Sequence, residues 1–304
     1  MSRPCWRQDT FVLILGPLVW SIACTSPPHN EATVSATPDT SPRARLGEAD
    51  KLYQQGNIAD AASLYDSVAE VDPQAGDASQ RALALSAAEK AVLCYQELTK
   101  DRLARAPAVA VGVPVPMRDN EAKLAHAAER LLKYVEDNKE RASNVHNLLG
   151  RLYFWHNRLD EALTHLTEVV SEVPEQAIAC QAAHLSLDIH NAREDYATLA
   201  DAAQALATND RLACTTQQKA TFSQVAEQAA FKSIERTYQG NAKPQEAAEA
   251  YLRFAEQHPA SDLSCAAIHN ATVSYHAAKQ PSDEARVRKL LSRRCGDWMK
   301  RNGF

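Results

Sequence analysis

The sequence is poor in glycine and in the residue runs that build β-strands. Its 304 residues include 9 glycines, and runs rich in valine, isoleucine, tyrosine and threonine are rare. From residue 45 onward the chain is dominated by Ala, Leu, Glu, Gln and Arg. These residues lose little conformational freedom in a helix, so the composition predicts an all-α fold.

The sequence also lacks an excess of positive charge. Its formal net charge is −5, and basic residues do not alternate with aromatic ones in any segment. Proteins that bind nucleic acids need a basic surface that neutralises phosphates, and single-strand binders add aromatic side chains on which bases stack. We therefore expect no nucleic-acid partner.

The sequence signatures of catalytic and cofactor sites are missing. There is no G-x-S-x-G, P-loop or G-x-G-x-x-G motif, and the ten histidines include no H-E-x-x-H pair. His269 and His276 share a helix face but have no carboxylate at ligand spacing, and the C-x-x-C pair typical of zinc sites is absent. We expect no enzyme activity, cofactor or metal. The alternative is a helical-repeat enzyme that acts on envelope glycans through a recessed acid pair.

No hydrophobic run is long enough to span a membrane, since a spanning helix needs about 20 apolar residues. The longest run, residues 11–23, has 13 residues and follows a short basic start. This arrangement is typical of a secretory signal peptide over residues 1–24. Its end, Ser21–Cys24, resembles the lipobox of bacterial lipoproteins, although that family prefers Leu three residues before the cysteine. The resemblance implies lipid attachment at Cys24, and cleavage near Ala23 without lipidation is the alternative.

The segment after the signal peptide, residues 25–45, is rich in Pro, Ser and Thr and poor in apolar residues. It cannot bury enough apolar surface to offset the entropy lost on ordering, so we expect a flexible linker. Because no acidic residue directly follows Cys24, the lipoprotein resemblance implies an outer-membrane protein facing the periplasm. Without lipidation, the protein would be soluble in the periplasm.

The clearest helix–turn–helix pattern in the chain ends at Pro174. Gly150 and Ala162 have little or no side chain, so two antiparallel helices can approach closely there, while Tyr153 and Leu166 fill the surrounding space. Pro174 ends the second helix because it has no amide proton to donate. This pattern resembles the tetratricopeptide repeat (TPR).

Further copies of the pattern lie before and after this one. Pro73 ends another copy, 101 residues before Pro174, which is close to three repeats of about 34 residues. A third copy ends at Pro259, a fourth covers residues 262–298, and a weaker one covers residues 177–208. The residues expected to pack at the helix contacts of the first three copies are Gly150, Tyr153, Ala162, Ala61, Tyr65, Ala247 and Tyr251.

The repeats predict one TPR-like helical domain over residues 46–298, followed by a C-terminal tail over residues 299–304. The resemblance implies a right-handed α-solenoid of about five to six TPR-like helical hairpins. Two helices, one ending near Arg105 and one starting near Asn120, flank residues 106–118, where three prolines forbid a helix. We interpret this insertion as a loop lying on the solenoid, and a partner-binding loop is the alternative.

Stacked repeats form a concave groove lined by the first helix of each pair. In the clearest copy the family's groove positions fall on Asn144, Asn147, Arg151, Phe154 and Trp155. Amide and guanidinium groups donate several hydrogen bonds, which suits a peptide backbone or a carboxylate. The alternative is that these residues only solvate an exposed face.

The resemblance therefore implies a non-enzymatic protein-binding scaffold or adaptor. It would help to assemble or organise a multiprotein complex of the bacterial envelope, with envelope proteins or peptides as partners and a lipid anchor to the membrane. The alternative without lipidation is a soluble periplasmic TPR adaptor or a chaperone-like binder.

Disulfides are possible, because an exported protein meets an oxidising compartment. Cys265 and Cys295 are equally far from the turn between two antiparallel helices, so they lie level and can form a bridge. Cys180 and Cys214 flank the weaker repeat and form a second candidate pair. Cys94 would remain alone as a small buried residue.

Overall fold

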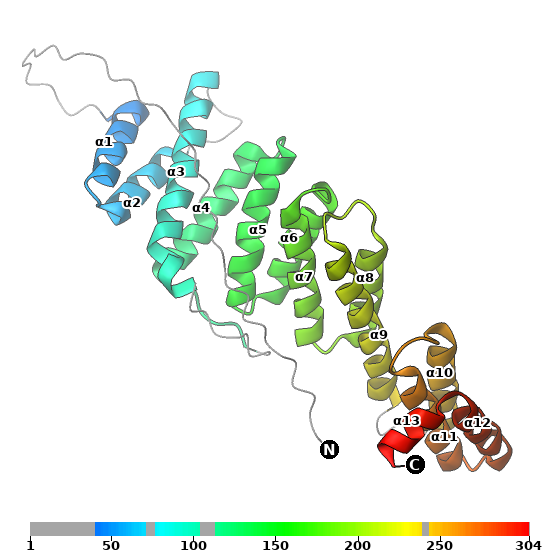
Figure 1. The fold of residues 1–304 in the computed structure, drawn as a ribbon. Helices are drawn as coiled ribbons and strands as arrows, with labels where there is room; N and C mark the ends of the chain where they lie inside the picture. Colours follow the sequence, from blue (N-terminus) through cyan, green and yellow to red (C-terminus); the bar gives the residue numbers. More distant parts are fainter. Residues whose placement is uncertain (1–39, 71–76, 104–112, 239–242, 304) are drawn as a thin grey trace, which may run out of the picture. The chain divides into compact units, whose positions relative to one another are not determined.

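The computed structural model describes residues 40–70, 77–103, 113–238 and 243–303. Every regular element in these ranges is a helix, and there are thirteen of them (Figure 1). The all-α prediction is therefore confirmed for this part of the chain. The predicted signal peptide, Cys24 and most of the predicted linker lie outside the described residues.

The described helices belong to two compact units, divided between Pro107 and Ala108. The first unit contains α1 (Pro42–Gln54), α2 (Ile58–Val68) and α3 (Ala78–Leu103). The second unit contains α4 (Asp119–Val135), α5 (Lys139–Trp155), α6 (Leu159–Glu172), α7 (Ala177–Ala192), α8 (Tyr196–Thr208), α9 (Thr216–Tyr238), α10 (Pro244–Gln257), α11 (Ser264–Ala277), α12 (Pro281–Arg294) and α13 (Gly296–Asn302). The sequence predicts one continuous domain over residues 46–298. The division into two units falls within the proline-containing insertion, after α3 has ended and before α4 begins.

Both ends of the predicted repeat domain differ from the helix boundaries. Helix α1 begins at Pro42, so the end of the predicted linker is helical. The Ser41 side chain accepts a hydrogen bond from the Ala44 amide at 3.2 Å, and proline fits the first helical turn because an N–H there would have no helical partner. The predicted tail over residues 299–304 is also partly helical, since α13 extends to Asn302. Ser41 and Pro42, which belong to the Ser- and Pro-rich segment predicted as a linker, therefore start a helix.

Four hairpins share the same backbone turn. Their first helices are α1, α5, α7 and α11, and each is followed by a residue with positive φ: Gly56 (79°), Asn157 (54°), Glu194 (54°) and Lys279 (56°). The N–H of this residue donates to the carbonyl three residues earlier, and the next N–H donates to the carbonyl five residues earlier. This is the Schellman arrangement, which satisfies the last carbonyls of a helix. The shared turn gives the four hairpins a common register.

Helices α5 and α6 approach each other closely at Gly150. A Cβ atom at this position would lie 2.7 Å from Cγ of Leu166 and 3.4 Å from the carbonyl oxygen of Ala162. The missing side chain is therefore what permits the contact. The seven predicted packing residues are all buried: Gly150, Tyr153, Ala162, Ala61, Tyr65, Ala247 and Tyr251.

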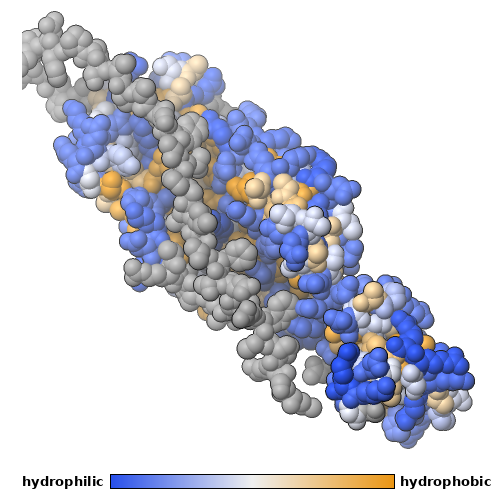
Figure 2. Space-filling view, viewed as in Figure 1, coloured by the Kyte–Doolittle hydropathy of each residue, from blue (hydrophilic) through white to orange (hydrophobic). Residues whose placement is uncertain are grey.

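Within the second unit each helix packs against the next one in the chain, and α5 also packs against α7. Neighbour-to-neighbour packing of this kind is what stacked helical repeats require. On the face seen in Figure 2 the exposed side chains are mainly hydrophilic, with smaller hydrophobic areas among them. No helix in the described ranges has both the length and the apolar composition needed to cross a bilayer.

Candidate functional site

The predicted groove residues lie along the surface of α5. Asn144, Asn147, Arg151 and Trp155 follow one another at spacings of three and four residues, which places them on one side of the helix. Asn144 is exposed, whereas the other three and Phe154 are half-buried. The structure therefore leaves all five side chains partly accessible to a ligand.

Arg151 carries a positive charge that the protein does not neutralise locally. Its guanidinium carbon lies 5.2 Å from the centroid of the Trp155 ring, a cation–π contact that orients the group. The surrounding protein excludes water and thereby lowers the pKa of Arg151. Among the described residues Arg151 has no carboxylate partner. Its charge is thus available to an incoming acidic group.

Helix α7 presents an unpaired charge of opposite sign at the matching position. Arg151 lies six residues before the turn residue Asn157, and Asp188 lies six residues before the corresponding turn residue Glu194. The Asp188 side chain is open to solvent, yet the protein around it displaces enough water to raise its pKa to about 6. Within the described ranges Asp188 forms no ion pair or hydrogen bond with another side chain.

Asp188 is not apparent as a site residue from the sequence, because α7 lacks the side-chain signature of the repeat. Leu187 stands where α5 has Gly150, and His190 stands where α5 has Tyr153. The turn before Tyr196 was the available signal, since its register assigns position 188 to the same helix face. We define the α5–α7 face as Asn144, Asn147, Arg151 and Trp155 of α5 with Gln181, His184 and Asp188 of α7.

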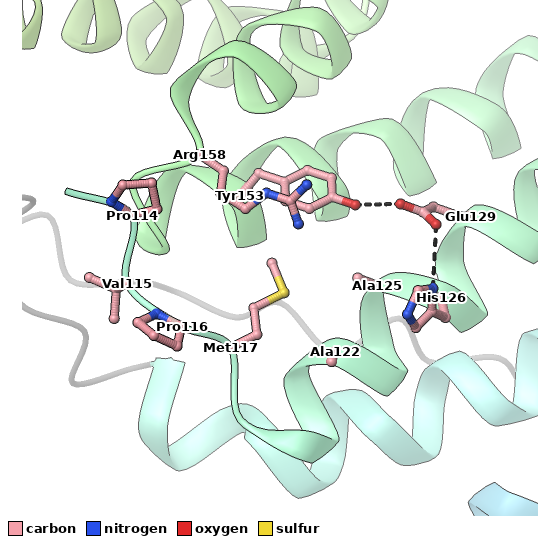
Figure 3. A pocket seen from close by; sticks show the side chains of 10 residues that line it. All are labelled: Pro114, Val115, Pro116, Met117, Ala122, Ala125, His126, Glu129, Tyr153 and Arg158. Atoms are coloured by element: carbon pink, nitrogen blue, oxygen red, sulfur yellow. Dashed lines mark hydrogen bonds and ion pairs between the residues drawn. The ribbon is translucent and has the colours of Figure 1, made fainter. Parts of the chain in front are cut away.

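A pocket of about 440 Å³ lies beside α5, between α4 and the extended segment Val113–Met117 (Figure 3). It is lined by Pro114, Val115, Pro116, Met117, Ala122, Ala125, His126, Glu129, Tyr153 and Arg158. The Val115 N–H donates to the carbonyl of His156 at 2.8 Å, and the Asn157 side-chain amide donates to the carbonyl of Val113 at 3.0 Å. The described end of the proline-containing insertion is thus fastened to the turn between α5 and α6.

The polar wall of this pocket consists of side chains that already bind one another. The Tyr153 hydroxyl donates to Glu129, and the ring of His126 lies 3.7 Å from the same carboxylate (Figure 3). Arg158 lies 4.6 Å from the centroid of the Tyr153 ring and donates through Nε and Nη2 to Glu161. Burial and the Glu129 acceptor raise the pKa of Tyr153, so its hydroxyl remains a donor. The proline, valine and methionine side chains opposite suit an apolar group of a ligand.

A histidine pair joins α5 to α6 next to this wall. The Nδ1 atoms of His146 and His165 are 2.8 Å apart, and the His165 ring stacks on Tyr153 with centroids 5.6 Å apart. Two ring nitrogens at this distance require one donor and one acceptor. Burial lowers the pKa of both rings, and the neighbouring His146 contributes to lowering that of His165 to about 4. The pair is therefore uncharged at neutral pH.

Both predicted cysteine pairs are joined in the structure. The Sγ–Sγ distance is 1.97 Å for Cys180 and Cys214 and 2.14 Å for Cys265 and Cys295. The first bridge ties α7 to the connection between α8 and α9, and the second closes the last long hairpin. Cys94 is a buried free thiol in α3, and burial raises its pKa to about 11.

The two histidines that share a face of α11 have separate partners. His269 packs against Trp298 with ring centroids 5.8 Å apart, and Nδ1 of His276 lies 2.9 Å from a carboxylate oxygen of Glu284. In the part of the chain that the structure describes, no three His, Cys, Asp or Glu side chains are grouped so that they could hold a metal ion.

Comparison with known proteins assigns no family to the chain. No family model matches the sequence, and no curated protein matches it at a significant level.

Proposed function

We propose that this protein is a non-enzymatic scaffold or adaptor that binds other proteins at the bacterial cell envelope. In this proposal the helices form a right-handed α-solenoid of TPR-like hairpins. The observation that carries the proposal is the backbone turn shared by four hairpins. Because equal turns set equal angles between paired helices, stacked hairpins present their first helices on one side and build a continuous binding surface.

The polar groups of α5 support a binding role. Asn144, Asn147 and Arg151 have no hydrogen-bond partner among the described residues, although Asn147 and Arg151 are half-buried. These side chains remain accessible, so their amide and guanidinium groups can donate hydrogen bonds to a bound partner. The pocket of about 440 Å³ beside them can accept an apolar side chain, and such anchors supply much of the energy of protein interfaces.

Affinity purification from detergent-solubilised envelopes tests the proposal. We expect the tagged wild-type protein to retain envelope proteins, and the variant Asn147→Ala/Arg151→Ala to lose them with unchanged helical circular dichroism. The matched control is Thr164→Ala/Thr167→Ala on the exposed side of α6, which should retain the partners. Equal capture by both variants would remove α5 from the binding site.

The anchoring part of the proposal depends on Cys24. We expect the mature chain from native membranes to begin at Cys24 with added acyl mass, and the Cys24→Ala variant to leave the membrane fraction. An unmodified N-terminus in the soluble fraction would replace the lipoprotein with a soluble periplasmic adaptor, and the helical body would be unaffected.

A further inference from the structure

Two charges of opposite sign on the α5–α7 face lack partners. Arg151 and Asp188 occupy the same register position in consecutive hairpins, and the helices that carry them are packed together. Neither side chain forms an ion pair with a described residue, although Arg151 contacts the Trp155 ring. Arg151 is half-buried, and most other half-buried charged side chains have a partner of opposite charge, as Glu284 does with Arg288 at 2.6 Å. The half-buried Arg151 is therefore an exception that a bound acidic group would explain, and the exposed Asp188 beside it is accessible to a basic group of the same ligand.

The surroundings of the two charged groups favour the binding of a ligand. The Trp155 ring holds the guanidinium of Arg151, which reduces the side-chain entropy that binding would otherwise remove. Protein atoms displace water around both groups, which lowers the pKa of Arg151 and raises that of Asp188. Both shifts favour the uncharged form of the group. The attraction between opposite charges is stronger where protein atoms replace water than it is in bulk water.

The distance between the helices limits the shape of the ligand. Axes of packed helices are about 8–10 Å apart. An extended peptide advances about 3.3 Å per residue, so two or three residues cover this distance. Asn144, Asn147 and Gln181 flank the charges, and their side-chain amides can both donate to and accept from a peptide backbone.

We propose that the α5–α7 face binds an extended peptide segment carrying an acidic and a basic side chain two or three residues apart. Arg151 takes the acidic side chain and Asp188 takes the basic one. The order of the two charges along the peptide fixes its direction across the helices. This inference rests on the proposed protein-binding function and adds to it the class of sequence that is bound.

A peptide array with fluorescent, full-length mature protein tests the inference. The probes are Ala/Ser/Gly peptides with one Glu and one Lys in either order, separated by zero to six residues. Matched peptides replace Glu with Gln, Lys with Gln, or both. We expect the strongest binding when the charges are two or three residues apart in one order, and about tenfold weaker binding when either charge is removed.

Four variants test whether Arg151 and Asp188 cause the charge preference. In Arg151→Gln the dependence on Glu should disappear, and in Asp188→Asn the dependence on Lys should disappear. The exchange Arg151→Asp/Asp188→Arg should reverse the preferred order of the charges. The control Arg253→Gln/Glu256→Gln alters two exposed charges of α10 and should leave the preference intact.

Two results would overturn the inference. One is wild-type binding that is absent or independent of peptide charge, and the other is an unchanged preference in Arg151→Gln and Asp188→Asn. If either occurs while Asn147→Ala/Arg151→Ala still loses its envelope partners, α5 binds proteins by another chemistry and the proposed function stands. If the wild type captures no partner at all, the proposed function fails independently of the array.

Discussion

Replacing Gly150 with alanine tests the close contact between α5 and α6. The added methyl group would lie 2.7 Å from Cγ and 2.8 Å from Cδ2 of Leu166, well inside the normal carbon contact distance of about 3.5–4 Å. Leu166 is 0% exposed, so surrounding residues restrict its movement. Forcing an extra methyl group into a packed core costs about 1–3 kcal/mol.

Helix propensity acts in the opposite direction, because alanine is favoured over glycine within a helix by about 1 kcal/mol. We therefore expect Gly150→Ala to lower the free energy of unfolding by about 1 kcal/mol. Gly47 in α1 is the matched control, since it is exposed and no atom lies within 4 Å of a Cβ there. Gly47→Ala should raise the free energy of unfolding by about 0.5–1 kcal/mol.

Amide hydrogen exchange, measured separately for the α1–α2 and α5–α6 hairpins, gives the local free energy of opening for each variant. A second variant, Leu166→Ala, provides a double-mutant cycle with Gly150→Ala. The two changes together should cost less than the sum of their separate effects, because removing the leucine relieves the clash. Equal stabilisation by Gly150→Ala and Gly47→Ala would refute the close contact.

The remaining predictions concern the turns, the second disulfide and the histidine pair. Glu194→Gly and Lys279→Gly should each raise the melting temperature, because a positive φ costs a residue with a side chain about 1 kcal/mol that glycine avoids. Replacing Cys265 and Cys295 with serine opens a 30-residue loop and should lower the free energy of unfolding by up to about 4 kcal/mol in chemical denaturation. The folded-state pKa of His165, about 4, lies below its unfolded value of 6.5, so the unfolded chain binds the proton more tightly. Stability should therefore fall by up to about 3 kcal/mol between pH 7 and pH 4, and His165→Gln should flatten this dependence. A wild-type stability that is constant over this range would contradict the lowered pKa.

The turns were predictable because they depend on local chemistry. Gly56 supplies the positive φ without strain, and Asn157 is one of the residues that tolerate it. Pro281 marks the start of α12, where its missing N–H has no cost. Local signals of this kind act over a few residues, so a single sequence is sufficient to show them.

The features that depend on spatial neighbours were harder to predict from the sequence. Asp188 became recognisable only when the turn at Glu194 aligned α7 with α5, since the packing residues of the two hairpins differ. The pocket depends on Val115 meeting His156, residues 41 positions apart, and no periodic pattern encodes that contact. The sequence did not predict the start of α1 at Pro42, because a Ser–Pro pair occurs both in linkers and at the first turn of helices.

Site-specific photo-crosslinking in living cells tests the binding surface most directly. A photoreactive amino acid replaces Asn147 on the α5–α7 face, and the control carries it at Thr164 on the exposed side of α6. We predict that illumination joins an envelope protein to position 147, that Arg151→Gln weakens this product, and that position 164 gives none. Crosslinks at position 164 alone, or equal products at both positions, would contradict partner binding through the first helix of each hairpin.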